Sequence, residues 1–464
     1  MIKLLCVEWI RFRRNPLNIW IISLFFLLLT ISAIWSGLAA REFRAKASAP
    51  AIQQSATNQA EMHDAPKMSE AASKSTTKSS AYSVSSAKEP LRLPALGGLV
   101  LNVSQMDLLS PTIKISTRSR HTDGRTSDQL FNPLMHEFGL LDFATVFALL
   151  TPLVIIALTY GLVQEDRESG VWRLVCTQTS QPWRLVFTAL ILRYGLLLLI
   201  GVTASVLAFL LDPASTGIAA GQWVFMLAVY NVVWFSMAGL FMLLQISSGA
   251  VAIAMLGTWL VLTFGVPAGI SWAADRSSPM PSRMKAIIDI RQFQEQTNQQ
   301  RESLLTDWYQ AHPEIKPNGP LKSLPREING LPATLELDSR IRPLMVQFDE
   351  ARQHQFVFME RWSGLSPALG LILMSDRLAG IDAPRYAEFV QAVNQFEDQW
   401  RGFFVPLIMA NAPWSDDQQQ SLPQFVVAKD GDLSASLSLP LSQLKIAVIL
   451  LGLLIGLRSR FAKT

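Results

Sequence analysis

Few residues of this chain could do chemistry, and the densest group lies in one charged stretch. Residues 164–184 read QEDRESGVWRLVCTQTSQPWR and separate two long apolar runs. The candidate residues in it are Glu165, Asp166, Glu168, Gly170, Trp172 and Leu174. Carboxylates beside an apolar knob are suited to docking on another protein, where tryptophan is a frequent hot spot. The stretch therefore predicts a binding element rather than a catalytic one.

The same stretch has a helical pattern, which we expect to form one short amphipathic helix around Arg167–Thr177. Gly170 permits a sharp bend. Trp172, Leu174 and Val175 supply the apolar knob. A helix of this kind could lodge in a groove of a soluble partner and pass rigid-body motion to both apolar runs. The alternative is an ordinary solvated loop.

Signatures of catalysis are absent from the sequence. It contains no glycine-rich phosphate loop, no nucleophile elbow and no two-histidine zinc helix. The five histidines lack the spacing of metal ligands: His63, His121, His136, His312 and His354. We therefore expect isolated solvated histidines rather than a metal site, no enzyme activity and no cofactor bound by this chain.

The composition is that of a membrane protein. Half of the 464 residues are hydrophobic, 16% are charged, and the apolar residues form runs of bilayer-spanning length. A net charge of +4 is too small and dispersed to indicate nucleic acid. The two cysteines, Cys6 and Cys176, indicate neither a disulfide framework nor a cysteine zinc site. We expect an all-α polytopic membrane protein.

Six transmembrane helices are predicted, because an unpaired backbone group in hydrocarbon is costly and each run should therefore be helical. The runs are 18–38, 142–163, 186–211, 223–244, 250–272 and 441–457. Tryptophans near their ends suggest an interfacial aromatic belt: Trp20, Trp35, Trp223 and Trp272. Arg193 is the only charge inside the third run, and we expect its side chain to extend back towards the cytoplasm.

Basic residues give the orientation. Lysine and arginine are concentrated in residues 1–17, in the 164–185 loop and in the 458–464 tail, whereas 212–221 has none. By the positive-inside rule, both termini and the loop are cytoplasmic. Residues 1–17 also space apolar and basic residues as an interfacial amphipathic helix would. We expect a multi-pass protein of the bacterial inner membrane.

Two segments are then external. Residues 41–139 include 45–90, whose Ala, Ser, Thr and Lys composition predicts disorder, while 91–139 is more apolar and could pack against the second segment. That second segment, 273–440, is long enough for its own core and shows three amphipathic helical patterns separated by proline-rich connectors. We expect a mostly helical external domain.

The chain resembles the permease subunit of ATP-binding-cassette (ABC) transporters of the type-2 exporter-like class. The acidic EDRESG stretch (165–170), the amphipathic N-terminal helix and the six runs follow that pattern. Three external blocks resemble the branch with a large domain between the last two spans, often labelled as permeases for multicopper-enzyme maturation. They are SSPMPSRMKAI (277–287), LSPALGLILMSDRLAGID (365–382) and RYAEFVQAVNQFEDQWRGFFVPLI (385–408). Residues 45–90 match nothing in that pattern.

The resemblance implies partners. It implies a cytoplasmic ABC ATPase that carries ATP and Mg²⁺, and a second permease subunit, identical or related. Glycines suited to close helix contact could face the second subunit: Gly195, Gly201, Gly239 and Gly257. ATP-driven motion would enter through residues 164–185 and tilt the spans, exporting substrate or relaying force. The alternative is a non-transporting scaffold whose external domain binds a periplasmic partner.

Overall fold

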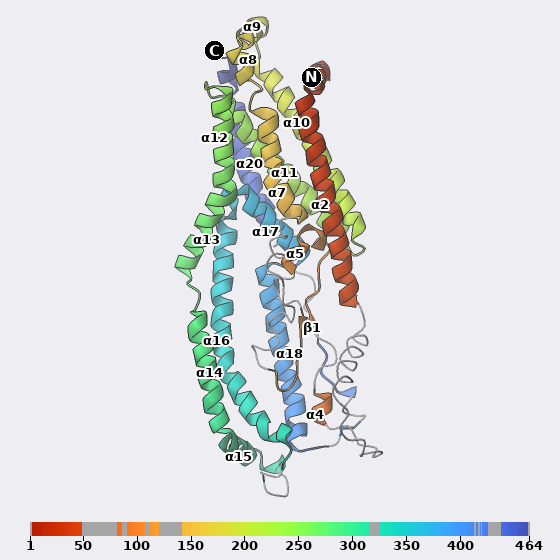
Figure 1. The fold of residues 1–464 in the computed structure, drawn as a ribbon, viewed down its shortest axis with the longest axis vertical. Coiled ribbons are helices and arrows are strands. Elements are labelled where there is room, and N and C mark those ends of the chain that lie inside the picture. Colours follow the sequence, from red (N-terminus) through yellow and green to blue (C-terminus); the bar gives the residue numbers. More distant parts are fainter. Residues whose placement is uncertain are drawn as a thin grey trace, which may run out of the picture.

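The protein is an elongated assembly of helices (Figure 1). The computed structural model describes residues 2–48, 81–85, 91–106, 112–119, 142–315, 321, 324–412, 414–415, 418, 420–425 and 438–462. Both ends of the chain lie at one end of the molecule, which we call the proximal end (Figure 1). The opposite end is built by the distal domain, residues 278–425 with parts of the segment 81–119.

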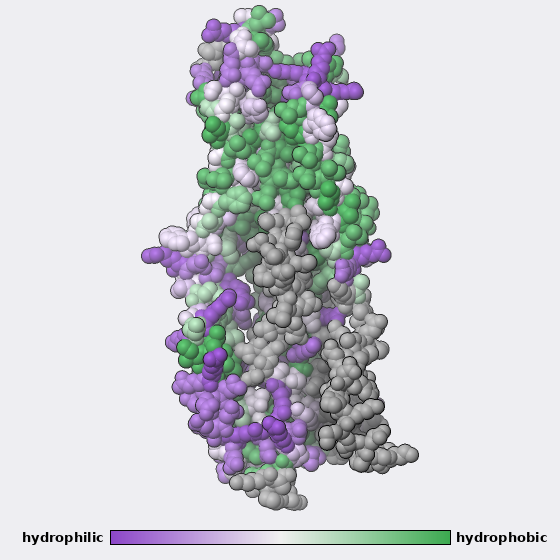
Figure 2. All heavy atoms as spheres, viewed as in Figure 1, coloured by the Kyte–Doolittle hydropathy of each residue, from purple (hydrophilic) through white to green (hydrophobic). Residues whose placement is uncertain are grey.

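The proximal part is a bundle of mostly apolar helices. They are α1 (Ile2–Arg14), α2 (Pro16–Ser48), α7 (Phe143–Thr159), α8 (Gln164–Glu168), α9 (Val171–Gln178), α10 (Trp183–Leu211), α11 (Gly217–Phe241), α12 (Ser248–Leu260), the π-helical turn η3 (Val261–Gly265), α13 (Val266–Ser277), α20 (Ser438–Gly456) and the 3-10 helix η8 (Arg458–Ala462). Figure 2 shows the apolar belt that they form.

Five segments of this bundle are long and apolar enough to cross a membrane. They are Pro16–Ala45, Phe143–Glu168, Trp183–Leu211, Gly217–Phe241 and Ser248–Ser277, and Leu441–Gly456 is a shorter apolar helix. The described residues are predominantly helical, with one short two-stranded sheet, and the apolar helices are compatible with a multi-pass membrane protein. Helices α2 and α10 extend beyond the predicted runs 18–38 and 186–211, whereas α7 and α11 end before residues 163 and 244.

The largest difference concerns residues 45–90, for which we predicted disorder. Helix α2 runs through Ser48, so residues 45–48 are helical, and Ala81–Val84 form the one-turn helix α4. The remainder of that prediction lies outside the described residues, apart from Ser85. An alanine-rich end such as AREFRAKAS retains good helix propensity, which explains the continuation of α2.

The distal domain is mostly helical, as predicted for the segment 273–440. Its elements are β1 (Leu91–Arg92), η1 (Leu99–Leu101), α5 (Val103–Met106), β2 (Thr112–Ile113), α14 (Arg283–Gln299), α15 (Arg301–Ala311), η4 (Pro313–Ile315), α16 (Arg326–Trp362), η6 (Ser363–Leu365), α17 (Pro367–Ala379) and α18 (Ala383–Met409). The two strands pair antiparallel, with Leu91 opposite Ile113. Residues 91–106 and 112–119 pack on the later helices, as predicted for the described part of 91–139.

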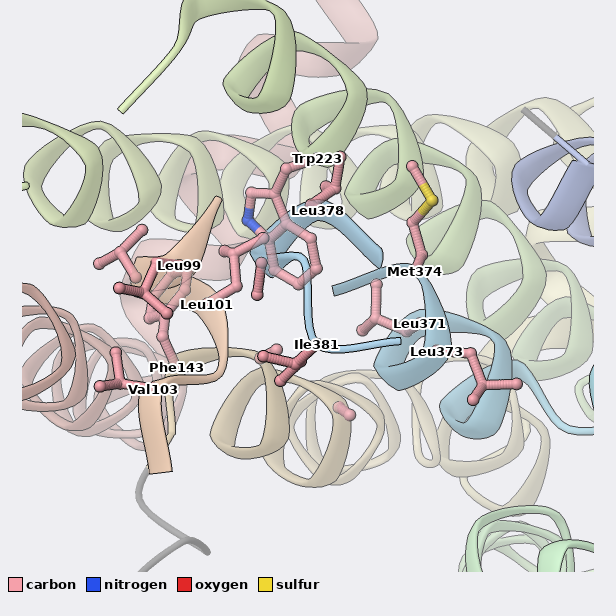
Figure 3. Packing of buried hydrophobic residues seen from close by; sticks show 14 of the residues in the cluster. Leu99, Leu101, Val103, Phe143, Trp223, Leu371, Leu373, Met374, Leu378 and Ile381 are labelled. Carbon is pink, nitrogen blue, oxygen red and sulfur yellow. The ribbon is translucent and has the colours of Figure 1, made fainter. Parts of the chain in front are cut away.

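Helix α17 joins the distal domain to the bundle (Figure 3). Its buried Leu371, Met374 and Leu378 lie beside Trp223 of α11, which contacts Phe143 of α7 at 6.1 Å between ring centroids. The prediction that Trp223 belongs to an interfacial belt is therefore wrong, because the ring is fully buried in the core. The other three belt candidates are exposed: Trp20, Trp35 and Trp272.

The N-terminus of α17 also contacts the π-helical turn within the segment Ser248–Ser277. Ser366 Oγ donates a hydrogen bond of 2.6 Å to the carbonyl oxygen of Leu262 in the π-helical turn η3. A π-helical turn breaks the regular i to i−4 pattern, so its carbonyl groups need other donors. On the other side, the Gln443 side-chain amide of α20 donates to the carbonyl oxygens of Ser363 and Ser366.

Asp376 on α17 should make the stability of the protein depend on pH. Burial raises its pKa from 3.8 to about 7, while Asn102 opposes the shift by donating to its carboxylate and Asp382 and Asp142 add to it. The folded protein then binds this proton more tightly than the unfolded chain does, so the free energy of unfolding falls as pH rises between about 4 and 7. Purified protein in detergent should have a lower melting temperature at about pH 8 than at about pH 5. Asp376→Asn should reduce that difference, and an unchanged difference would contradict the assignment.

Candidate coupling site

The stretch 164–178 forms two short helices rather than one. Helices α8 and α9 meet at Gly170, whose φ of +76° lies in the left-handed region that glycine adopts at little cost. This confirms the predicted bend and corrects the single helix predicted for Arg167–Thr177. We call residues 164–178 the hub, because their side chains reach several other elements at the proximal end.

Helix α8 is fixed to the end of α11. The Gln164 side-chain amide donates to the carbonyl oxygen of Met242 at 3.3 Å. The Arg167 guanidinium donates to the carbonyl oxygens of Met242 and Leu244 at 3.2 and 3.0 Å. Carbonyl groups at a helix C-terminus lack partners within the helix, and a cation is favourable there. Helix α8 therefore caps α11.

The acidic residues of α8 reach two further helices. Asp166 accepts two hydrogen bonds from Arg11 of α1, at 3.0 and 2.9 Å. Glu168 accepts from the backbone N–H of Ser248 at 2.6 Å and from its hydroxyl at 3.2 Å, at the first residue of α12. A carboxylate at a helix N-terminus satisfies free N–H groups and opposes the positive end of the helix dipole. Glu165 is exposed.

Trp172 lies elsewhere than the sequence predicted. Only 3% of it is exposed, and its Nε1 donates to the carbonyl oxygen of Phe461 in η8 at 3.2 Å. The C-terminal residues 458–462 therefore form a packed element and not a free tail. Trp172 is an internal contact, which corrects its assignment as the knob presented to a partner. The exposed apolar residues of α9 are Val171 and Leu174, the latter 60% exposed.

Helix α1 is attached by a buried ion pair that the sequence analysis missed. Arg193 Nη1 of α10 donates to Glu8 Oε1 at 2.8 Å, and Arg193 Nε donates to the carbonyl oxygen of Leu158 in α7 at 2.9 Å. The guanidinium carbon also lies 5.3 Å from the centre of the Phe12 ring. Arg193 is thus buried and paired, which corrects the prediction that it extends back to the cytoplasm.

A signal for this pair was present in the sequence. Glu8 is the only acidic residue in α1, and Arg193 is the only charge within α10 beyond its first turn. A lone charge within an apolar helix favours pairing with an opposite charge on a neighbouring helix, since it is costly to bury alone. The hub and this ion pair together join α1, α7, α10, α11, α12 and η8 at one end of the bundle.

The glycines predicted at an interface divide into two groups. A side chain at Gly201 would meet Phe147 at 2.9 Å, and one at Gly239 would meet Leu454 at 2.6 Å. Both therefore serve close packing within this chain, which corrects their assignment to an interface between subunits. Gly195 and Gly257 have open space around the Cβ position and remain available.

The side chains of the hub connect several elements at the proximal end of the bundle. Among the described residues, no group of three or more His, Cys, Asp or Glu side chains is arranged to hold a metal ion. Each hub side chain that bonds outside the hub reaches a helix end or a C-terminal turn. The hub is therefore bonded to α1, α11, α12 and η8 at the same time.

Comparison with known proteins bears on the distal domain. A family model described as a domain of unknown function, DUF3526, matches residues 283–428. The DUF3526 match begins with α14 and extends past α18, so it excludes the hub and most of the bundle. It covers less than half of the chain. No curated protein and no solved structure matches this chain.

Proposed function

We propose that the chain is the membrane-spanning permease subunit of an ABC transporter, which couples ATP hydrolysis by a separate ATPase to export or to force relay across the membrane. The contacts and exposed side chains of the hub support this proposal most directly. The hub exposes apolar side chains at the tip of the molecule and is bonded to the ends of α1, α11, α12 and η8. A partner seated on α9 would therefore move several helices together.

In this proposal the proximal end is cytoplasmic, the membrane is the bacterial inner membrane, and the distal domain is periplasmic. The described parts of the three basic segments that gave the predicted orientation, 1–17, 164–185 and 458–464, lie at the proximal end, where Figure 1 places both termini with α8 and α9. That distribution favours a cytoplasmic location. Helix α20 is the sixth span, and α17 covers its distal end through Gln443.

A second permease subunit, identical or related, is part of the proposal. Among the five long apolar segments, Ser248–Ser277 is the least buried within the chain. Its exposed side chains include Ile253, Leu260 and Phe264, and its Gly257 has open space at the Cβ position. Small residues between larger apolar ones allow two helices to approach closely in a bilayer.

The proposal predicts a specific effect of Leu174→Arg. Leu174 is exposed and makes no side-chain hydrogen bond, so the variant should fold and insert normally. Loss of an apolar contact at a binding hot spot costs about 2 kcal/mol, which lowers affinity for the ATPase by about tenfold or more. The measurement is recovery of the copurified ATPase, quantified by ATP hydrolysis, at matched membrane levels of the two proteins.

Ile288→Arg is a matched control, because Ile288 is 56% exposed but lies on α14 at the distal end. It should leave ATPase recovery at the wild-type level. Equal recovery with wild-type protein and with Leu174→Arg would show that α9 does not bind the ATPase.

The second candidate function is a membrane scaffold whose distal domain binds a periplasmic partner. It is favoured by an apolar patch on α14 formed by Met284, Ile287 and Ile288, all exposed. Figure 2 shows apolar atoms over this helix, apart from the belt of the bundle. Ile288→Arg distinguishes the two functions, because a scaffold would lose its periplasmic partner while Leu174→Arg would leave that partner bound.

A further inference from the structure

Two arginines flank one tryptophan ring at the proximal end of the bundle. Trp183 is the first residue of α10, and its ring packs edge-on against Phe187 at 5.7 Å between centroids. The guanidinium carbon of Arg184 lies 5.6 Å from the centre of the Trp183 ring, and that of Arg458 lies 5.3 Å from it. The two cations come from residues far apart in the sequence and are brought together by the packing of η8 near α10.

These two charges are not balanced by acidic side chains. Arg184 and Arg458 are both exposed, and within the described part of the chain neither forms an ion pair. Each guanidinium group keeps N–H donors available beside the one ring that both contact. An anion bound there would be attracted by both charges, and guanidinium groups bind phosphate oxygens in a two-pronged geometry.

The position of the site indicates which phosphate it binds. Arg184 is the second residue of an apolar helix, and Arg458 follows directly after the last turn of another, α20. Both therefore lie where the apolar belt ends, at the depth of lipid headgroups. Exposed Leu185 and Ile455 continue from the same two helices into the belt and can contact an acyl chain.

We propose that an anionic phospholipid binds at this site, with its phosphate bridging Arg184 and Arg458 over the Trp183 ring. The lipid holds η8 against α10. Because the Phe461 carbonyl oxygen of η8 accepts a hydrogen bond from Trp172, the bound lipid also stabilises the packing of α9 against η8. This inference requires that α10 and α20 lie in a bilayer, and it does not depend on the ATPase partner.

Thermal unfolding of the full-length protein in neutral detergent tests the proposal. Phosphatidylglycerol should raise the melting temperature of the wild type, and phosphatidylcholine should do so much less. In Arg184→Gln/Arg458→Gln, the phosphatidylglycerol concentration for half-maximal protection should rise about 30-fold, since each arginine near an anionic lipid contributes about 1 kcal/mol. The effect should weaken in high salt, because exposed charges are screened.

Two variants and one further ligand control this experiment. Arg276→Gln removes the guanidinium 5.7 Å from the Trp272 ring, a single-arginine pair on α13, and should retain the protection. Arg184→Lys/Arg458→Lys keeps both charges and should recover most of it. Equal protection of wild type and the double glutamine variant, equal protection by the two lipids, or equal protection by inorganic phosphate alone would each overturn the proposal.

Discussion

Arg193→Met should release α1 from the bundle. The substitution leaves Glu8 as an uncompensated buried charge and removes the donor to the Leu158 carbonyl oxygen. Breaking a buried pair by removing one partner costs about 3–5 kcal/mol. Undocking of α1 is the change that removes this free-energy cost most readily, because it returns the Glu8 carboxylate to water. Amide hydrogen exchange in residues 2–14 should accelerate by about a hundredfold or more, since about 1.4 kcal/mol corresponds to a factor of ten.

The double variant Glu8→Gln/Arg193→Met separates charge burial from loss of packing. Removing both charges should restore most of the protection of α1, because a neutral replacement of a buried pair is often tolerated. Unchanged exchange in residues 2–14 of the single variant would show that the ion pair does not hold α1.

Arg401→Met should destabilise the distal domain by a similar amount. Arg401 Nη1 pairs with Asp338 at 2.6 Å and Nη2 pairs with Glu397 at 2.8 Å, and Nη2 also donates to the Ser119 carbonyl oxygen. The Asp338 side chain is only 1% exposed, so it would lose this cation without gaining contact with water. The expected loss is about 3–5 kcal/mol, seen as faster proteolysis of α16 and α18 and a lower midpoint of denaturant unfolding.

A matched control lies on the same two helices. Arg342 of α16 pairs with Asp398 of α18, but their side chains are 31% and 53% exposed. Arg342→Gln should therefore cost no more than about 1 kcal/mol, as exposed ion pairs do. Comparable losses in Arg342→Gln and Arg401→Met would mean that burial does not determine the strength of these pairs.

The sequence was most informative where the physical cause of a structural feature lies in a short local pattern of residues. Long apolar runs predicted the bundle helices, because a run of about 20 apolar residues can form a helix of membrane-spanning length. Gly170 predicted the bend between α8 and α9, because only a residue without a Cβ adopts a positive φ freely. The amphipathic pattern of residues 1–17 likewise predicted α1.

Contacts between distant residues could not be predicted in this way. Trp172 was expected to face a partner because its local pattern is the same whether an external protein or Phe461 covers it. Asp166 bonds to Arg11 and Glu168 bonds to Ser248, and no periodicity in the sequence records either pairing. Gly201 and Gly239 illustrate the same limit, since a small residue is needed at any close contact, inside one chain or between two.

The helical segment Ser248–Ser277 connects the hub to the distal domain. Thirty helical residues extend about 45 Å, and the contact from Ser366 to Leu262 lies close to the midpoint of that length. At one end of the segment, Glu168 accepts a hydrogen bond from the Ser248 backbone N–H. Just past its other end, the Gln355 side chain of α16 donates to the Ser278 carbonyl oxygen. In the function proposed above, a tilt of this segment by about 10° about the Leu262 contact would displace each end by about 4 Å. The segment would then carry motion from the hub to the distal domain.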